Sequence, residues 1–135
     1  MSMMKIFDIS GSAVSSQSQR LNTVASNLAN VDTVAGPDGK AYKAREVTFQ
    51  TVLMGTPDGI PGAGVRVSGV SEDESPGRKV HDPSSPNADA DGYVTYSNVN
   101  AVDEMVNMIS AQQDYQANLE AFNVAKTLAM RTLTI

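Results

Sequence analysis

Apolar and polar residues alternate with a helical period over the last third of the chain. From Ala101 onward there is no proline or glycine, and most residues favour helices. Asn100 is placed to cap the start of this helix, which at about 1.5 Å per residue would run roughly 45 Å. One stripe has spacings that alternate between three and four, which predicts a coiled-coil seam interrupted by polar residues. Its positions are Met105, Met108, Gln112, Tyr115, Leu119, Phe122, Lys126, Ala129 and Leu133.

The first part of the chain, residues 5–30, shows a second helical pattern built from smaller side chains. Large apolar residues recur every seven positions, and a small residue stands four places after each of the first three. Such a surface lets another helix approach closely. Five serines lower the intrinsic helix propensity, so this segment is expected to fold when it packs. The large positions are Phe7, Val14, Leu21 and Leu28, and the small ones are Gly11, Ser18 and Ala25.

The middle of the chain, residues 35–100, has the pattern of short strands and turns. Asn30 is expected to end the first helix, and the Gly36-Pro-Asp-Gly39 stretch is typical of a tight turn. The fold class is therefore α+β, with an N-terminal helical segment (1–34), a β-rich insert (35–100) and a C-terminal helical segment (101–135). Strands are expected at 42–53, 65–70, 78–81 and 93–96, with a flexible loop at 55–64.

Composition narrows the classes of function. The chain has 135 residues, no tryptophan, three phenylalanines and four tyrosines, so a large aromatic core is not expected. The net charge of −5 argues against nucleic acid as a partner, because binding would require a cationic surface. Cysteine is absent, which excludes disulfides, thiolate metal sites and cysteine nucleophiles. No signal peptide or membrane span is expected from the apolar runs.

The segment 87–98 is similar to a calcium-binding loop in its first half only. Asn87, Asp89 and Asp91 stand two residues apart and Gly92 follows, but Asn98 occupies the position where a bidentate glutamate is needed. The preceding prolines also exclude an entering helix. An Asp-Gly turn before a strand is therefore the favoured interpretation, and no metal site is expected.

Other candidate chemistry is equally weak. His81 is the only histidine, and no nucleophile is marked for it. Gly62 and Gly64 lack the third glycine and the following helix of a phosphate-binding loop. The methionines are better interpreted as adaptable packing residues than as ligands. No active site, cofactor or small-molecule substrate is expected, and the chain is not predicted to be an enzyme.

Both ends carry a more specific resemblance. Leu21-Asn-Thr-Val-Ala-Ser-Asn-Leu-Ala-Asn30, followed by Thr33, is similar to the N-terminal signature of the bacterial flagellar axial proteins, the family of rod, hook and hook-associated proteins. The stretch from Tyr115 to Leu133 resembles their C-terminal signature. The start of the chain, the turn at 36–39 and the segment 88–100 are similar to the small proximal-rod members. The resemblance covers nearly the whole chain and is weakest at 54–63.

The resemblance implies a structural function. Such proteins are exported through the flagellar type III apparatus without cleavage of a signal peptide, and they assemble in the periplasm into the helical rod of the basal body, which transmits motor torque. The implied partners are other copies of the chain, other rod proteins, the export apparatus, and the MS ring with the export gate at the base of the rod. The terminal helices would form the inner layers of the tube.

The residues expected to make assembly contacts lie on the two terminal helices. We expect helix–helix contacts, within and between subunits, at the apolar positions and buried side-chain hydrogen bonds at the asparagines. Purely intramolecular roles are the alternative for each. These residues are Phe7, Val14, Leu21, Asn27, Leu28, Asn30, Met105, Met108, Tyr115, Asn118, Leu119, Phe122 and Leu133.

Two other interpretations of the whole chain compete with a polymerising subunit. The helices could form a self-contained hairpin that binds a soluble partner, although a two-helix hairpin would bury these stripes only in part. Within the flagellar family, a sibling rod subunit is the nearest alternative. A small enzyme is disfavoured because no catalytic group is marked.

Overall fold

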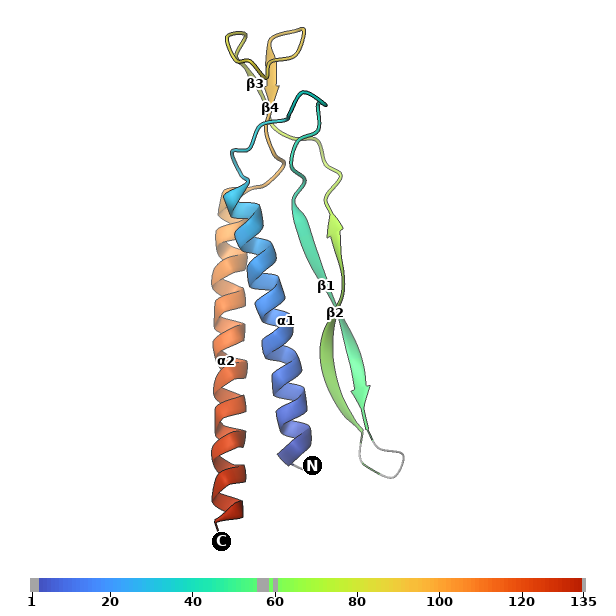
Figure 1. Ribbon diagram of the computed structural model, residues 1–135, viewed down its shortest axis with the longest axis vertical. Helices are drawn as coiled ribbons and strands as arrows, with labels where there is room; N and C mark the ends of the chain where they lie inside the picture. The colour runs from blue at the N-terminus through green and yellow to red at the C-terminus, as the bar shows by residue number, and fades with distance from the viewer. Residues whose placement is uncertain (1–2, 56–58, 60, 135) are drawn as a thin grey trace.

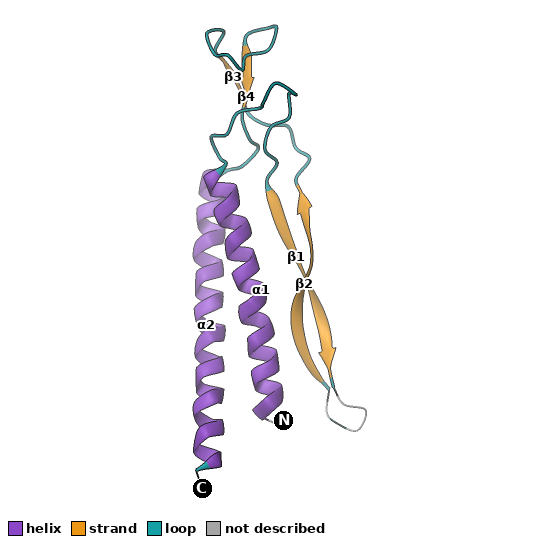
Figure 2. Cartoon of the chain, viewed as in Figure 1, coloured by secondary structure: helices purple, strands orange, loops and turns teal. Residues whose placement is uncertain are grey.

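The computed structural model describes residues 3–55, 59 and 61–134 of the chain. Two long helices, α1 (Met3–Ala29) and α2 (Ala101–Leu133), run antiparallel (Figure 1). A long hairpin of β1 (Arg45–Met54) and β2 (Gly62–Glu72) lies along α1, on the side away from α2. The short strands β3 (Lys79–His81) and β4 (Tyr93–Thr95) form a small head beyond the helices (Figure 2). The predicted α+β class, with two terminal helices and a β-rich insert, is confirmed.

The middle layer of the molecule is α1. It contacts α2 on one side and both strands of the hairpin on the other, whereas in the described part of the chain α2 contacts no helix or strand except α1. Neither helix offers a described stretch that is long and apolar enough to cross a membrane. The order of the layers is thus α2, α1, hairpin.

Local signals place the helix ends. The side chain of Asn100 accepts hydrogen bonds from the backbone of Val102 and Asp103, so the predicted N-terminal cap is confirmed. Asn30 follows the last turn of α1, and its Nδ2 donates at 2.8 Å to the carbonyl of Ser26, which also accepts the backbone N–H of Asn30 at 3.2 Å. Helix α1 thus ends before Asn30, as predicted.

The two sheets are separate antiparallel pairs. In the hairpin, Arg45 pairs with Glu72 and Met54 with Gly62, and the register shifts at a bulge between Thr48 and Phe49. The first strand starts three residues later than the pattern predicted, and the second starts at Gly62, inside the predicted loop 55–64; part of that loop lies outside the described residues. The turn at 36–39 is confirmed, and Gly39 has a φ of +74°.

Few large side chains are fully buried. The buried apolar residues are two valines and four alanines of the helices and insert, and the largest side chain with essentially no exposure is the amide of Asn27. A chain that places an asparagine, and not a leucine or phenylalanine, at its best-covered position has little hydrophobic core of its own. The buried apolar residues are Val24, Ala35, Ala44, Val94, Ala111 and Ala125.

Candidate functional site

The face of α2 that lies against α1 differs from the predicted seam. Met108 and every second seam position after it, up to Ala129, are half-buried against α1. The seam positions between these residues are exposed. Met105 is 56% exposed and Leu133 is 86% exposed, so within one chain these positions do not form a seam. The covered positions between the large residues are small or polar instead. The covered face consists of Ala101, Glu104, Met108, Ala111, Tyr115, Asn118, Phe122, Ala125 and Ala129.

On both helices, the covered positions between the large residues lie one residue before the predicted ones, and α1 shows this clearly. The large predicted positions Phe7, Val14, Leu21 and Leu28 are all half-buried, whereas the small positions Ser18 and Ala25 are exposed. The better-covered residues between the large ones are Ser10, Gln17 and Val24, which stand three places after them.

Two specific contacts fix the alignment of the helices. The rings of Phe7 and Phe122 meet edge to face, with centroids 5.1 Å apart. The predicted small residue Gly11 also lies here, since a Cβ at this position would be 4.0 Å from the Phe122 ring. Further along, Arg20 forms an ion pair with Asp114 at 3.4 Å. Both contacts connect residues at matching heights on antiparallel helices.

A large apolar surface on α2 is left uncovered. Near its start, Val102, Met105, Val106 and Ile109 are all more than half exposed, and Ile109 is 57% exposed. Near its end, the exposed apolar residues are Val124, Leu128, Met130 and Leu133. Leu119 is 37% exposed, at the edge between the covered and open faces. A helix with apolar residues on all sides is typical of one that is buried within an assembly.

The serines of α1 form the site where the hairpin docks. Ser12 Oγ accepts a hydrogen bond from the backbone N–H of Val65 at 3.1 Å, and Ser16 Oγ donates to the carbonyl of the same residue at 3.3 Å. Both backbone groups lie on the edge of β2 that faces away from β1. The helix approaches closely because Gly62 and Gly64 carry no side chain: a Cβ on Gly62 would lie 3.3 Å from Ile9 Cδ1. From the sequence, these serines indicate only weak helix propensity.

Asn27 joins α1 to the start of the hairpin. Its Nδ2 donates to the carbonyl of Arg45 at 2.8 Å, and its Oδ1 accepts from the N–H of Arg45 at 3.0 Å and from the hydroxyl of Tyr42 at 2.9 Å. The predicted buried hydrogen bonds of Asn27 are therefore confirmed. By contrast, Asn118 Nδ2 donates to the carbonyl of Asp114 in its own helix, so this bond does not set the register between helices.

A second asparagine, missed in the sequence, holds the insert together. Asn98 Oδ1 accepts from the N–H of Ala44 at 2.6 Å, and its Nδ2 donates to the carbonyls of Asp73 at 2.7 Å and Ser75 at 2.9 Å. Three backbone segments thereby meet at one side chain. Next to this point, two hydrogen bonds from Ser75, first from its hydroxyl and then from its N–H, lower the pKa of Asp73 below 3.8.

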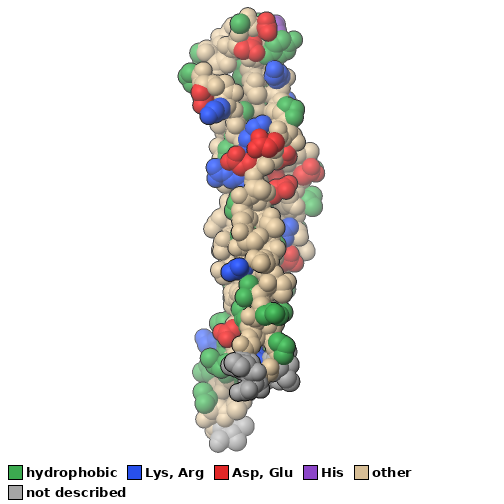
Figure 3. Space-filling view, turned by 90° about the vertical axis from the view of Figure 1, so that its right-hand side faces the viewer, with side chains coloured by type: hydrophobic (Ala, Val, Ile, Leu, Met, Phe, Trp, Pro, Cys, Tyr) green, Lys and Arg blue, Asp and Glu red, His purple; other side chains and the backbone are tan. Residues whose placement is uncertain are grey.

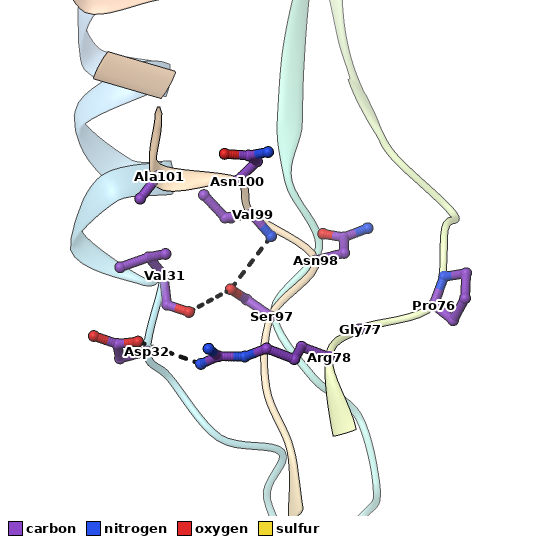
Figure 4. Close-up of a pocket in the computed structure, with 10 residues that line it drawn as sticks. All are labelled: Val31, Asp32, Pro76, Gly77, Arg78, Ser97, Asn98, Val99, Asn100 and Ala101. Carbon is purple, nitrogen blue, oxygen red and sulfur yellow. Dashed lines mark hydrogen bonds and ion pairs between the residues drawn. The ribbon is translucent and has the colours of Figure 1, made fainter. Parts of the chain in front are cut away.

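A cavity of about 550 Å³ lies where the helices meet the head (Figure 4). Ser97 Oγ donates to the carbonyl of Val31 at 2.7 Å, and Arg78 forms an ion pair with Asp32 at 3.6 Å. Arg78 and Asp32 are the only ionisable side chains in its lining, and they face each other (Figure 4). This arrangement joins the end of α1 to the segment that precedes α2.

The segment that is similar to a calcium-binding loop forms a turn, and His81 lies beside it in β3. Asp89 Oδ1 accepts from the N–H groups of Asp91 and Tyr93, and Gly92 has a φ of +83°, as expected for an Asp-Gly turn before a strand. His81 packs edge to face on Tyr93. Among the described residues, no group of three histidine, aspartate or glutamate side chains is placed to hold a metal ion.

Comparisons with known proteins agree with the resemblance of both ends. The family model of the flagella basal body rod protein matches residues 7–37, and that of the flagellar basal body rod FlgEFG protein C-terminal matches residues 90–135. The flagellar basal-body rod protein FlgC of Yersinia enterocolitica is 51% identical over 135 residues, which cover all of this chain and 98% of the relative.

Further relatives of the same kind match over similar lengths. The FlgC of Salmonella typhimurium is 49% identical over 138 residues, and that of Buchnera aphidicola from Acyrthosiphon pisum is 44% identical over 137 residues. Each alignment covers 100% of this chain and 98% of the relative. The chain therefore belongs to the FlgC family of flagellar basal-body rod proteins.

Proposed function

We propose that the chain polymerises through its terminal helical segments, residues 1–34 and 101–135, into the proximal rod and there transmits motor torque. As a member of this rod protein family, the chain has a structural role in the flagellar basal body and assembles with other rod subunits. The proposal adds the location within the rod, the participation of other copies of the chain, and the helices as the surfaces of contact. Catalysis has no part in it.

The observation that carries the proposal is the open apolar surface of α2. Its exposed valines, methionines, isoleucine and leucines extend over both halves of the helix, while its single neighbour among the described elements, α1, covers one side. Exposed apolar surface of this extent favours association, because each copy removes apolar area of the next from water. We assign Met105, Leu119 and Leu133 to contacts between subunits for this reason.

The remaining predicted contact residues have a shared role in this proposal. Phe7, Val14, Leu21, Leu28, Met108, Tyr115 and Phe122 are half-buried within one chain, so each keeps exposed area for a neighbouring subunit. Half-burial of large side chains is common at positions that are completed by a partner.

Export before assembly is the second part of the proposal. We infer that the chain passes through the flagellar type III apparatus in an unfolded or partly folded form, without a cleaved signal peptide, and assembles in the periplasm above the MS ring. Two features support this. The serines of α1 weaken its helix propensity, and the absence of cysteine means that folding outside the cytoplasm requires no disulfide.

The test uses a strain that lacks its own rod subunit and is complemented with this chain. Ile109→Asp places a charge on the open face of α2 without touching the α1–α2 contact, so we expect normal folding by circular dichroism but loss of motility and of rods in isolated basal bodies. Lys40→Asp, at an exposed position of the turn outside the terminal helical segments, is the control and should retain motility. Normal swimming with Ile109→Asp would contradict the proposed contact surface.

The self-contained helical hairpin remains the alternative, because α1 and α2 do pack on each other within one chain. Hydrogen exchange on the dilute purified chain separates the two. Fast exchange over both terminal segments is expected for ends that are stabilised on assembly. Strong protection of both helices in a monomer would favour the binding module.

A further inference from the structure

The two strands of the hairpin exchange places along α1. At the base of the hairpin β1 faces the helix, where both backbone groups of Arg45 are hydrogen-bonded to Asn27. Nearer the tip β2 faces the helix instead, where Val65 is hydrogen-bonded to Ser12 and Ser16. The strands cross between these points (Figure 1), next to the bulge, which increases the local twist. The edge of β1 nearer the tip therefore faces away from α1.

This edge of β1 presents backbone groups that β2 does not use. In an antiparallel pair, residues opposite each other either exchange both of their hydrogen bonds or turn their backbone groups outward. The N–H and carbonyl of Val65 are turned outward to the serines of α1, so those of its partner Thr51 are turned outward from β1. The same holds two residues away on either side, at Phe49 and Leu53. Within the described part of the chain, no hydrogen bond reaches these groups. We call residues 49–53 the open edge of β1.

The open edge lacks the features that keep strand edges apart. Natural edges are commonly protected by charged residues or proline, but residues 47–54 contain neither, and they contain no glycine. Its apolar side chains are accessible, since Phe49 is 36% exposed and Leu53 is 78% exposed. On the hairpin side of the molecule, hydrophobic side chains gather toward the tip, whereas acidic ones gather near the base (Figure 3). A free edge of this composition favours pairing with another uncharged strand.

We propose that two copies of the free chain pair through their open edges, antiparallel, around a two-fold axis at Thr51. In this register the side chains of the edge are complementary to themselves. Thr51 lies opposite Thr51 of the second copy, and Phe49 lies opposite its Leu53. Thr–Thr pairs stabilise antiparallel strands, and Phe49 and Leu53 remove each other's apolar surface from water. Like charges do not meet, because the edge has none.

The pairing closes after two copies. It joins the hairpins into one sheet in the order β2, β1, β1, β2, and the β2 edge at each end is already bonded to Ser12 and Ser16 of its own α1. Among the described residues of this half of the hairpin, no open edge remains for a third strand, and a two-fold contact does not propagate. The dimer is therefore a form of the free chain, and the inference stands apart from the proposed rod function. The contact is smaller than a standard protein interface, so the dimer is expected at high protein concentration.

Association through the open face of α2 has to be separated from this contact. All variants below therefore carry Ile109→Asp, which places a charge on that face. In sedimentation velocity, Ile109→Asp alone should form dimers and no larger species as its concentration rises. A monomer at every concentration up to the solubility limit would overturn the proposed pairing. The rod function is tested independently by the motility of the same variant, so the two proposals can fail separately.

Charges at Thr51 test the two-fold axis. Thr51→Lys and Thr51→Glu each place two like charges opposite each other, so each should lower the association constant by about tenfold or more, and an equimolar mixture of the two should restore it. Ser71→Lys, at an exposed position of β2 outside the contact, is the matched control and should dimerise like its parent. Circular dichroism checks that each variant is folded. Unchanged association of Thr51→Lys or Thr51→Glu alone, or a mixture no better than its parts, would overturn the proposal.

Cysteine cross-linking tests the register without a charge change. The chain contains no cysteine, so each substitution introduces a single thiol. Oxidised at a concentration that gives dimers, Thr51→Cys should form disulfide-linked pairs about tenfold faster or more than Gln50→Cys, whose side chain lies on the other face, opposite Val52 of the second copy. In a mixture, Phe49→Cys and Leu53→Cys should link to each other faster than either links to itself. Equal rates for Thr51→Cys and Gln50→Cys would refute the pairing around Thr51.

Discussion

The side chain of Asn27 is hydrogen-bonded to both backbone groups of Arg45, as a neighbouring strand would be. The amide of asparagine has one donor and one acceptor side, and here they match the carbonyl and the N–H of the first residue of β1. The hydroxyl of Tyr42 donates a third hydrogen bond, to Oδ1 of Asn27. With 0% exposure, Asn27 thus fixes the point at which the hairpin leaves the helix.

Replacing Asn27 is expected to be costly. Asn27→Ala leaves the N–H and carbonyl of Arg45 without their partners in a place that water does not reach, so the free energy of unfolding should fall by about 2–4 kcal/mol. Urea denaturation followed by circular dichroism measures this. The control is Asn22→Ala on the exposed face of α1, with an expected change within about 0.5 kcal/mol. Equal effects of the two would contradict the role of Asn27.

The two kinds of serine on α1 should respond in opposite directions. Ser12→Ala removes the acceptor of the Val65 N–H, and we expect a loss of about 1 kcal/mol in stability together with faster exchange of the Val65 amide. Ser18→Ala, on the exposed face of the same helix, should stabilise the chain slightly because alanine is the better helix former. If Ser12→Ala also stabilised, the hairpin would not depend on this contact.

A pair of glycines gives a similar contrast in the insert. A Cβ on Gly77 would collide with the carbonyl oxygen of Tyr96, and the N–H of Tyr96 donates to the carbonyl of Arg78. Gly77→Ala should therefore lower the free energy of unfolding by about 3 kcal/mol and shift the NMR signals of Tyr96. Around Gly69 a Cβ meets nothing within 4 Å. Gly69→Ala should therefore be neutral or stabilise by up to about 1 kcal/mol. Thermal unfolding of the two variants compares them directly.

The turn at Asp73 should depend on pH only in acid. The hydroxyl of Ser75, followed by its N–H, lowers the folded pKa of Asp73 below 3.8, so the contribution of this turn is fully present above the unfolded pKa and is lost as the pH falls through the folded one. An NMR titration of the Asp73 carboxyl carbon measures this pKa. In Ser75→Ala the hydroxyl is gone and the pKa should move up toward 3.8. The same pKa in both proteins would exclude this cause.

The sequence predicted the elements of the fold better than their contacts. Both terminal helices, their ends and the order of the strands could be inferred, because these depend on local residue type and spacing. The seams could be inferred only in part. In α2 large apolar residues occur on every side, so Met105 and Leu119 looked like seam residues, although α1 packs closely on Ala111 and Ala125 instead. Periodicity does not distinguish a face that contacts α1 from one that is left for another subunit.

The partners in the contacts that position the hairpin could not be predicted. Ser12 and Val65 are 53 residues apart in sequence, and Asn98 and Ala44 are 54 apart. A serine in a helix or an asparagine before one has a sufficient local explanation, in weak propensity or capping, and no spacing indicates a distant backbone partner. Only Asn27 stands out in the sequence, because its surroundings resemble a family signature.

The hairpin is attached to α1 at two heights, through Ser12 and Ser16 at one and Asn27 at the other. About 22 Å of helix lies between Ser12 and Asn27 at about 1.5 Å per residue. To bend α1 toward or away from the hairpin, a load must lengthen or shorten the paired strands between these two attachments, which their backbone hydrogen bonds resist. The hairpin therefore stiffens α1, because the helix cannot bend without also deforming the two paired strands attached to it.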